Sequence, residues 1–486
     1  MADLSSLFTL SRSAVVQAGA GTGKTHSLIT LCLHLLGGIG RAEPVPPARL
    51  WAVTFTEKAA AELRARLRQR VDRLAEAGAG GPEGFGTSRG ELPRLEPELA
   101  RSCEAEGRAF PEQAIWQRAR RDLGLAQIDT IHSLCSQILR RHAAAAGLDP
   151  SFALLDELEA RSLAREACEA AVLDALEGGP LEGAARRLCA ELGFSGVGKF
   201  SRGLADELQA LLRAIGESGR SAVALVDSTV GLSEPLALSA EAQARSGLLR
   251  AIDTLEACAS VPGKRGLSSR AAATVPLCAE FRGRLWPAIA RAPVGELHEA
   301  AAAVAALEKQ LSALGQSKQI AEEKQAAEAA VEALLEADAH VRACRLSRDL
   351  AALSEQALSR YRERKKGLGA LDFDDLTRLT RDLLANDPAA RRSEKARIAA
   401  LLVDEFQDTS RAQLELFGWL AEGEGGEGTA PAGSGLPGAR PVAQGTFVAV
   451  GDRKQSIYEF RGADVAGAQQ FAGAALQDGA ELYRLR

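Results

Sequence analysis

Residues 14–25 read AVVQAGAGTGKT, and this stretch decides the fold. Its first four residues form an apolar, β-branched run that predicts a buried strand, and the residues after Thr25 have the apolar spacing of a helix that ends at Gly37 and Gly38. A glycine-rich loop between a strand and a helix turns backbone N–H groups towards a phosphate, and the helix adds the positive end of its dipole. The stretch therefore predicts a parallel α/β sheet with a phosphate-binding loop after its first strand.

The loop and its flanks supply nine consecutive candidate nucleotide-binding residues. They are Ala18, Gly19, Ala20, Gly21, Thr22, Gly23, Lys24, Thr25 and His26. Lys24 is expected to reach the β- and γ-phosphates, and the Thr25 hydroxyl to ligate Mg²⁺. The strict pattern begins with glycine, where this chain has Ala18. Taken alone, the loop also fits an ordinary strand–helix turn.

A second stretch, LLVDEFQDT at 401–409, supplies the other half of such a site. Its apolar strand ends in two adjacent carboxylates, Asp404 and Glu405. Acidic residues at the carboxyl end of a buried strand match the magnesium arm of a phosphate-loop site. We expect Asp404 to hold Mg²⁺, through water, and Glu405 to orient and deprotonate the attacking water. Acidic pairs of this kind are often solvated turns or helix caps, but the presence of Lys24 favours the functional interpretation.

Apolar runs predict three further pieces of the sheet, at 50–55, 398–403 and 447–450. Their near-continuous hydrophobicity is typical of strands covered by helices on both faces. Gln455 follows the last run by a few residues, where an uncharged amide is expected to contact a γ-phosphate or the attacking water. The predicted catalytic residues are therefore Glu405, Lys24 and Gln455.

Several side chains at or after the ends of these strands, and one on an expected adjacent loop, are candidate nucleic-acid contacts. They are Thr54, Phe55, Thr56, His132, Tyr458, Phe460 and Arg461. Only 4% of the residues are aromatic, so aromatic and arginine side chains beside the nucleotide residues favour stacking on bases. The hydroxyls that flank Phe55 are expected to contact phosphates. The alternatives are core aromatics with a solvent-exposed arginine, and a structural histidine.

The bulk composition limits the classes of protein. The chain has 486 residues and a formal net charge of -5, so its overall charge does not indicate a nucleic-acid binder. A protein that stacks bases in a local groove does not require a positive overall charge. None of the eight cysteines forms a CxxC pair, which argues against a zinc ribbon or an iron–sulfur cluster. We find no signal peptide and no apolar run of membrane-spanning length, and therefore expect a cytoplasmic protein without a membrane partner.

The composition of the sequence changes in the middle of the chain. From about Phe152 to Lys366, Ala, Leu, Glu and Arg dominate and strand-like runs nearly vanish. This predicts an all-α domain at 151–366, inserted into an α/β domain made of 1–150 and 367–486.

Together, these motifs resemble the UvrD/Rep group of superfamily 1 DNA helicases. The strings AGTGKT, VTFTEKAAAELR, TIHSLC, DFDDL, DEFQDT and GDRKQSIYEFRGAD carry the resemblance and lean towards its RecB/AddA-like branch. The resemblance implies a P-loop NTPase with a RecA-like sheet, and 3′→5′ translocation on single-stranded DNA driven by ATP and Mg²⁺ in DNA repair and recombination. It implies that Ala18 is a normal variant. An adenine-reading glutamine is missing from its usual place, His26 replaces a frequent arginine, and Phe460 replaces a tryptophan common in the UvrD branch.

The chain reaches Arg486 about where the family's next motif, with its arginine finger, would begin. We therefore expect the second RecA-like domain to be absent, and the isolated chain to bind ATP–Mg²⁺ and single-stranded DNA weakly without unwinding a duplex. Expected partners are single-stranded DNA, or a duplex with a single-stranded tail, and a second helicase half or a nuclease subunit. Two alternatives stay open: a catalytically silent DNA- or partner-binding module derived from a helicase, and a P-loop ATPase unrelated to DNA.

Overall fold

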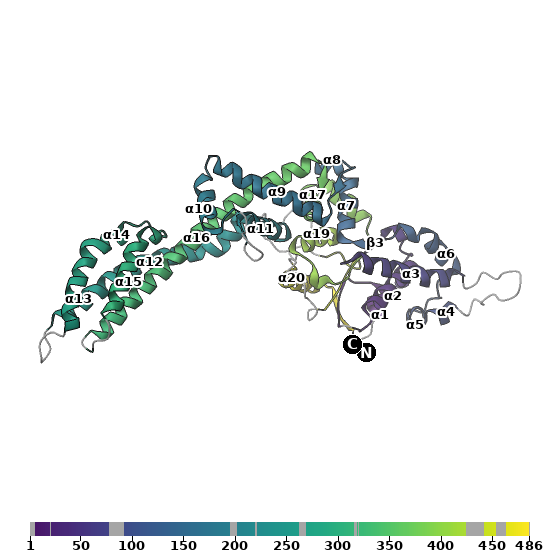
Figure 1. Cartoon of the computed structure of the whole chain (residues 1–486). Coiled ribbons are helices and arrows are strands. Elements are labelled where there is room, and N and C mark those ends of the chain that lie inside the picture. Colours follow the sequence, from purple (N-terminus) through teal and green to yellow (C-terminus); the bar gives the residue numbers. More distant parts are fainter. Residues whose placement is uncertain are drawn as a thin grey trace. The chain divides into compact units, whose positions relative to one another are not determined.

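The fold was described from a computed structural model of the chain (Figure 1). It describes residues 5–19, 21–76, 92–194, 202–218, 221–261, 269–314, 318, 320–423, 442–452 and 463–485. Residues from both ends of the chain build the main sheet, and the middle of the chain is helical. The predicted class, a parallel sheet flanked by helices with an inserted helical part, is confirmed.

Within the described residues the main sheet has six strands, and all of its neighbouring pairs are parallel. The strands are β1 (Ala14–Ala18), β2 (Leu50–Thr54), β3 (Gln127–Thr130), β6 (Ala400–Val403), β7 (Phe447–Gly451) and β8 (Glu481–Leu485). Their spatial order is β3-β2-β6-β7-β1-β8, which places β6 and β7 between β2 and β1. Because the strands run in one direction, the residues that follow them meet at one edge of the sheet.

The sequence predicted the four inner strands but not β3 and β8. These two strands are the outer members of the order, so each has a neighbour on one side only among the strands that the structure describes. Gln127 and Asp129 of β3 are half-buried, and in β8 Leu482 and Arg484 are exposed. Edge strands with polar, partly exposed side chains lack the continuous apolar run that marks a strand covered on both faces.

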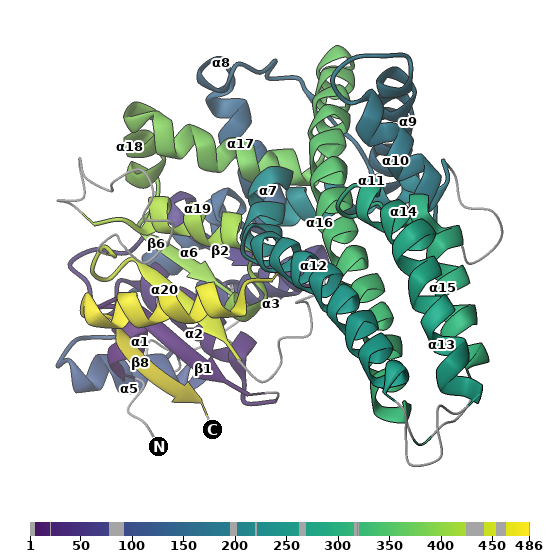
Figure 2. The same ribbon diagram turned by 90° about the vertical axis from the view of Figure 1, so that its left-hand side faces the viewer.

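In β2, β6 and β7, successive side chains pack against opposite layers of helices. In β2, Leu50 and Ala52 belong to one hydrophobic core, and Trp51 and Val53 to the other. The first core is closed by α1 (Ser5–Thr9), α2 (Lys24–Gly37), α3 (Glu57–Glu76), α5 (Pro97–Ala105) and α6 (Gln113–Asp122). The second is closed by α7 (Ile131–Arg141), α17 (Phe373–Asn386), α18 (Pro388–Ala396), α19 (Arg411–Ala421) and α20 (Val465–Gln477), and Figure 2 shows α20 crossing this face.

Short elements connect these helices and strands. They are η1 (Pro47–Arg49), α4 (Leu92–Leu95), η2 (Leu123–Leu125), α8 (Ala143–Ala146) and η5 (Phe406–Asp408). A separate two-stranded parallel sheet joins β4 (Ala153–Leu154) to β5 (Ala370–Leu371), so the chain segments on either side of the inserted helices lie next to each other.

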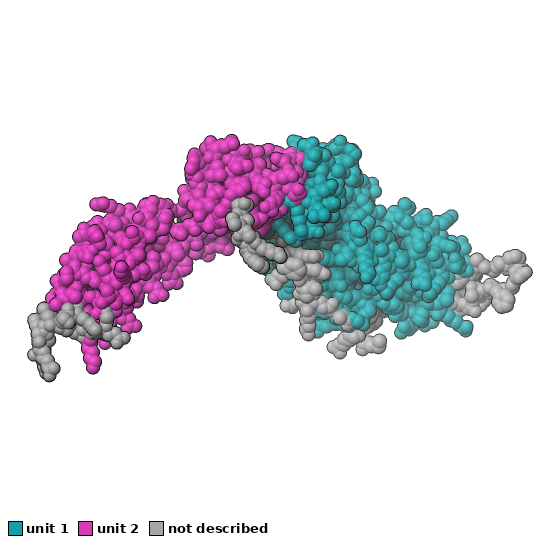
Figure 3. All heavy atoms as spheres, in the orientation of Figure 1, with its two compact units in different colours: residues 1–161, 213–219, 365–486 teal, residues 162–212, 220–364 magenta. Residues whose placement is uncertain are grey.

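The chain divides into two compact units (Figure 3). Unit 1 comprises residues 1–161, 213–219 and 365–486, and unit 2 comprises residues 162–212 and 220–364. The helices from the middle of the chain are α9 (Glu157–Leu176), α10 (Glu182–Leu192), α11 (Leu204–Ser218), α12 (Ala222–Ser260), α13 (Ser269–Glu280), η3 (Phe281–Leu285), α14 (Trp286–Arg291), η4 (Leu297–Ala300), α15 (Ala301–Ala313) and α16 (Ala321–Gly367).

Unit 2 has two hydrophobic cores that share α16. Val331 and Leu334 pack with the helices from α12 to α15, whereas Leu353 and Ala357 pack with α9, α10 and α11. None of the helices in the described ranges has both the length and the apolar character of a bilayer-spanning segment. No disulfide joins the eight cysteines, all of which lie in the described ranges.

Candidate nucleotide site and adjacent surface

The loop between β1 and α2 has the backbone conformation that a phosphate-binding turn needs. Gly21 and Gly23 have φ of 74° and 85°, in the left-handed region that favours glycine. The Thr22 hydroxyl donates to the carbonyl of Gly19 at 2.8 Å and closes the turn. Gly23 directly precedes α2, whose first turn directs backbone N–H groups out of the helix. Ala20 lies outside the described residues.

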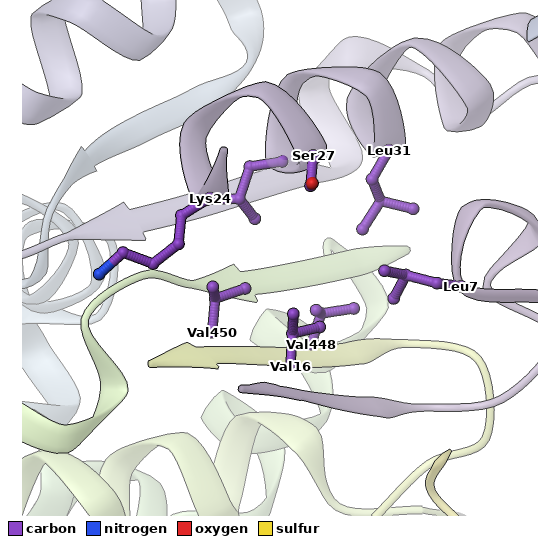
Figure 4. A pocket seen from close by; sticks show the side chains of 8 residues that line it. Leu7, Val16, Lys24, Ser27, Leu31, Val448 and Val450 are labelled. Atoms are coloured by element: carbon purple, nitrogen blue, oxygen red, sulfur yellow. The ribbon is translucent and has the colours of Figure 1, made fainter. Parts of the chain in front are cut away.

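Below the loop, α2 packs closely on the sheet. The small gap between them is lined by Leu7, Val16, Lys24, Ser27, Leu28, Leu31, Val448 and Val450. Figure 4 shows the aliphatic side chains gathered around this gap, whereas the amine of Lys24 extends away from them. The gap measures ≈ 10 Å³, about the space of one water molecule, so it is a packing gap and not a ligand pocket.

Lys24 meets the acidic pair at the end of β6. Its Nζ donates to both carboxylate oxygens of Glu405, at 2.9 Å each. The two side chains are only 13% and 34% exposed, so water screens the pair less than it would on the surface. The fold thus brings together the two sequence stretches expected to form one site. The roles predicted for these residues in binding and hydrolysis stay predictions.

Asp404 is held at the end of β6 in an environment that opposes its ionisation. Its N–H donates to the Val53 carbonyl at 2.9 Å, and its Oδ1 accepts the N–H of Glu405 at 3.0 Å. Burial, and then the negative charge of Glu405, raise the pKa of Asp404 from 3.8 to about 6, while the N–H of Glu405 and the charge of Lys24 act in the opposite direction. A nearby cation stabilises the ionised form of such a buried carboxylate. Carboxylates with perturbed pKa values are frequent at functional sites.

Glu405 itself has a strained backbone. Its φ is 50° and its ψ is 42°, in the left-handed region that non-glycine residues seldom occupy. The turn η5 follows immediately, so this conformation turns the chain sharply at the end of β6. Backbone strain of this kind costs of order 1–3 kcal/mol and is frequently found at functional sites.

Gln407 is a site residue that the sequence analysis missed. Its Nε2 donates to Glu405 Oε2 at 2.9 Å and to Asp408 Oδ2 at 3.1 Å. Its Oε1 accepts the N–H of Asp452, at the end of β7, at 2.9 Å. The only signal in the sequence is its position two residues after Glu405, in a turn that the structure shows to be buried.

The oxygen atoms at this edge of the sheet are suitable ligands for Mg²⁺. This ion prefers oxygen ligands and is usually held by one or two carboxylates together with phosphate oxygens and water. The carboxylate of Asp404 and the half-buried hydroxyl of Thr25 are oxygen ligands of this kind. Among the residues that the structure describes, no group of three or more His, Cys, Asp or Glu side chains could hold a metal alone. A divalent ion here would therefore depend on the phosphates of a ligand as well.

His26, the last residue of the predicted nucleotide-binding set, lies beside α5. Its Nε2 is 3.1 Å from Glu98 Oε2, which also accepts the Thr30 hydroxyl at 3.1 Å. Gln455, predicted to sense the γ-phosphate, lies outside the described residues, and its role stays a prediction.

The candidate nucleic-acid residues on β2 and β3 lie next to each other. Thr54 pairs with Thr130 in the sheet, so Phe55 and His132 follow at the same edge. Thr54 is only 3% exposed, and its hydroxyl donates to the Thr56 carbonyl at 3.0 Å. A phosphate contact through this hydroxyl would require the turn to open. Thr56 is exposed, and its hydroxyl accepts the N–H of Ala59 in the first turn of α3 at 3.1 Å.

His132 is paired with an aromatic residue from another helix. Its ring lies 5.0 Å from that of Phe373, at an interplanar angle of 60°. Phe373 is 41% exposed, so part of its ring faces solvent beside this edge of the sheet. Burial lowers the pKa of His132, so its imidazole is neutral at physiological pH. Sequence reasoning used the DFDDL motif at 372–376 only for the resemblance and missed Phe373 as a candidate contact.

The remaining candidate nucleic-acid residues are Tyr458, Phe460 and Arg461. They lie outside the described residues, and their contacts stay predictions.

The sheet order, the glycine loop and the acidic strand end define a phosphate-loop NTPase. The profile of the UvrD/REP helicase N-terminal domain matches residues 3–475, and the chain belongs to this family.

Curated relatives match shorter stretches. An ATP-dependent helicase/nuclease subunit from Desulforudis audaxviator is 34% identical over 158 residues, which are 32% of this chain and 10% of the relative. Its counterpart of the same name in Pelotomaculum thermopropionicum is 35% identical over 155 residues, again 32% and 10%. The ATP-dependent DNA helicase UvrD1 of Mycobacterium tuberculosis (strain ATCC 25618 / H37Rv) is 34% identical over 125 residues, 26% of this chain and 14% of the relative. The matches thus span a small part of each relative.

Proposed function

We propose that this chain acts as a motor domain of an ATP-dependent DNA helicase of repair and recombination, which moves 3′→5′ along single-stranded DNA. The observation that carries the proposal is the contact of Lys24 with Glu405 at the edge where Phe55 and His132 follow neighbouring strands. ATP hydrolysis and binding of a DNA strand would then take place at the same edge of the sheet. Family membership and the names of the relatives support the proposal.

In this function, Lys24 binds the β- and γ-phosphates. The same ammonium now donates to both oxygens of Glu405, so a triphosphate and Glu405 compete for it. When Lys24 turns to the phosphates, Glu405 is free to accept a proton from the water that attacks the γ-phosphorus. The backbone N–H groups of the loop and of the first turn of α2 hold the phosphates in place.

Asp404 and Thr25 would hold Mg²⁺ beside these phosphates. The ion, when bound, neutralises charge that develops on the phosphoryl oxygens. The raised pKa of Asp404 fits this role, because a cation restores the charged form that burial disfavours.

Phe55, His132 and Phe373 supply faces on which bases can stack. Stacking on aromatic side chains is tolerant of sequence and contributes about 1–3 kcal/mol per base. A neutral imidazole suits this use, since it adds a flat ring without a fixed charge. Grip by stacking also agrees with a net charge of -5, which gives no general attraction for DNA.

Nucleotide binding is tested by titrating a fluorescent ATP analogue in the presence of Mg²⁺. Lys24→Ala should weaken binding by about 100-fold or more, since it removes a charge that contacts two phosphates. Lys309→Ala, at an exposed position of α15 in unit 2, is the matched control and should bind as the wild type does. Equal affinity of wild type and Lys24→Ala would refute the assignment of this loop.

DNA binding is tested by fluorescence anisotropy with an oligo-dT strand at fixed salt. Phe373→Ala should weaken binding by about 5- to 150-fold, as the loss of one stacked base requires. Phe373→Trp retains a stacking face and should bind within about threefold of the wild type. Unchanged DNA affinity in both Phe373→Ala and Phe55→Ala would favour a P-loop ATPase that does not act on DNA.

A further inference from the structure

The ends of β6 and β7 are adjacent, but the sheet ladder does not connect the residues that follow them. The last β6–β7 pair is Val403 with Ala449. Beyond it the chain of β6 turns away into η5, whereas β7 continues to Gly451. The side chain of Gln407 connects the two segments beyond this last pair: it contacts Glu405 after β6 and the N–H of Asp452 after β7.

The orientation of the Gln407 amide is fixed by its partners. Both amide hydrogens have acceptors, the carboxylates of Glu405 and Asp408, and the amide oxygen has the N–H donor of Asp452. A rotated amide would place its oxygen against two carboxylates and its NH₂ group against an N–H. Gln407 is 5% exposed, so water cannot replace these partners easily.

Gly451 provides the space for this contact. A Cβ atom at Gly451 would lie 2.4 Å from Gln407 Oε1 and 3.3 Å from the backbone N of Gln407. The close approach of β7 to this amide therefore requires a residue without a side chain. Asp452 also borders the phosphate loop, because its Oδ2 lies 3.8 Å from the position of a Cβ on Gly19.

The turn itself does not need the Gln407 side chain. Backbone bonds close it, from Asp408 N to the Glu405 carbonyl at 2.9 Å and from Thr409 N to the Phe406 carbonyl at 3.4 Å. The Thr409 hydroxyl adds a bond to the same Phe406 carbonyl at 2.6 Å. The side-chain amide of Gln407 therefore links Glu405 to the end of β7, and it is not needed to form the turn η5.

We propose that Gln407 is a positioning residue, which orients the Glu405 carboxylate and transmits its displacement to the end of β7. Glu405 and Gln407 share one hydrogen bond, and Gln407 and Asp452 share the next, so movement of the carboxylate changes the bond to the Asp452 N–H. The consequence for hydrolysis rests on the proposed function, because there Glu405 leaves Lys24 when the triphosphate binds. The linkage between Glu405 and β7 needs no nucleotide.

A double-mutant cycle on amide exchange tests this linkage in the full chain. Lys24→Ala removes the cation that holds Glu405, and Gln407→Met replaces the amide by an apolar side chain of similar length. We expect Lys24→Ala to change the exchange rate of the Asp452 N–H by about fivefold or more when Gln407 is present, and by less than twofold in the Gln407→Met background. Equal changes in both backgrounds would show that Gln407 has only a structural role.

Two further measurements keep the outcome clear. Exchange of the backbone amides of β6 (Ala400–Val403) reports whether each variant is folded. If Gln407→Met does not fold, Gly451→Ala replaces it, because a Cβ at this position displaces the side-chain amide of Gln407 and should abolish the coupling equally. Titration with ADP–Mg²⁺ is the second: wild type and Gln407→Met should bind it within about threefold of each other. Failure of the wild type to bind nucleotide would refute the proposed function, while the exchange cycle would still decide the role of Gln407.

Discussion

Asp404→Asn should stabilise unit 1 while it removes a carboxylate of the proposed Mg²⁺ site. Burial and the charge of Glu405 raise the pKa of Asp404 from 3.8 to about 6. Each pH unit between two pKa values corresponds to 1.36 kcal/mol, so keeping this carboxylate ionised costs the folded protein about 3 kcal/mol. Asparagine keeps an oxygen that can accept the N–H of Glu405, as Asp404 Oδ1 does at 3.0 Å, but it carries no charge.

The sign of the pH dependence follows from the raised pKa. Above about pH 6 the folded protein holds Asp404 ionised and bears the full cost, whereas below pH 3.8 the group is protonated in both folded and unfolded chains and the cost disappears. The advantage of Asp404→Asn should therefore be about 3 kcal/mol at pH 7.5 and should decline through the window between pH 6 and 3.8.

Urea denaturation at several pH values measures this difference, with amide exchange in β6 as a readout that belongs to unit 1. Asp382→Asn is the matched control, because it removes a carboxylate that is 41% exposed and should change stability by less than about 0.5 kcal/mol. Added Mg²⁺ and nucleotide should stabilise the wild type more than Asp404→Asn. A variant less stable than the wild type at pH 7.5, or an advantage that grows as the pH falls, would refute the reasoning.

Two other substitutions test how unit 1 is held together, each by urea denaturation followed by circular dichroism. Lys365→Met should cost about 3 kcal/mol, because Lys365 is 4% exposed and its Nζ contacts two buried carboxylates, Asp372 at 2.6 Å and Asp375, of which Asp375 retains the contact with Arg378; a loss below about 1 kcal/mol would contradict this. Ser410→Ala should cost about 1 kcal/mol, because Ser410 and Gln413 form a capping box at the start of α19, and unchanged stability would contradict that role.

How much of the fold the sequence predicts depends on where each strand lies. The inner strands β2, β6 and β7 have apolar side chains on both sides, because helices cover both faces, and β1 is apolar except for Gln17, so the apolar runs of all four are visible in the sequence. The outer strands β3 and β8 have partly exposed side chains, and no run distinguishes them from a loop. The sheet order also brings residues from the two ends of the chain together, which the runs alone do not reveal.

The candidate site divides in the same way. Lys24, Asp404 and Glu405 are predictable, because each stands at a fixed place after a buried strand and has a chemistry of its own. Gln407 and Phe373 are not, because their partners are set by the tertiary structure. One partner is a backbone N–H at the end of β7, and the other is the ring of His132 on α7. A glutamine in a turn and a phenylalanine at the start of a helix give no such indication.

The central claim is that Lys24 and the Asp404–Glu405 pair surround one triphosphate, and the ATP affinity of Glu405→Gln tests it most directly. Glu405 accepts two hydrogen bonds from Lys24 at 2.9 Å, so neutral glutamine releases the ammonium and removes a negative charge beside the phosphates. We expect ATP–Mg²⁺ to bind about 5- to 30-fold more tightly, equivalent to ~1–2 kcal/mol. Binding that is unchanged or weaker than in the wild type would show that Glu405 and the triphosphate do not share Lys24.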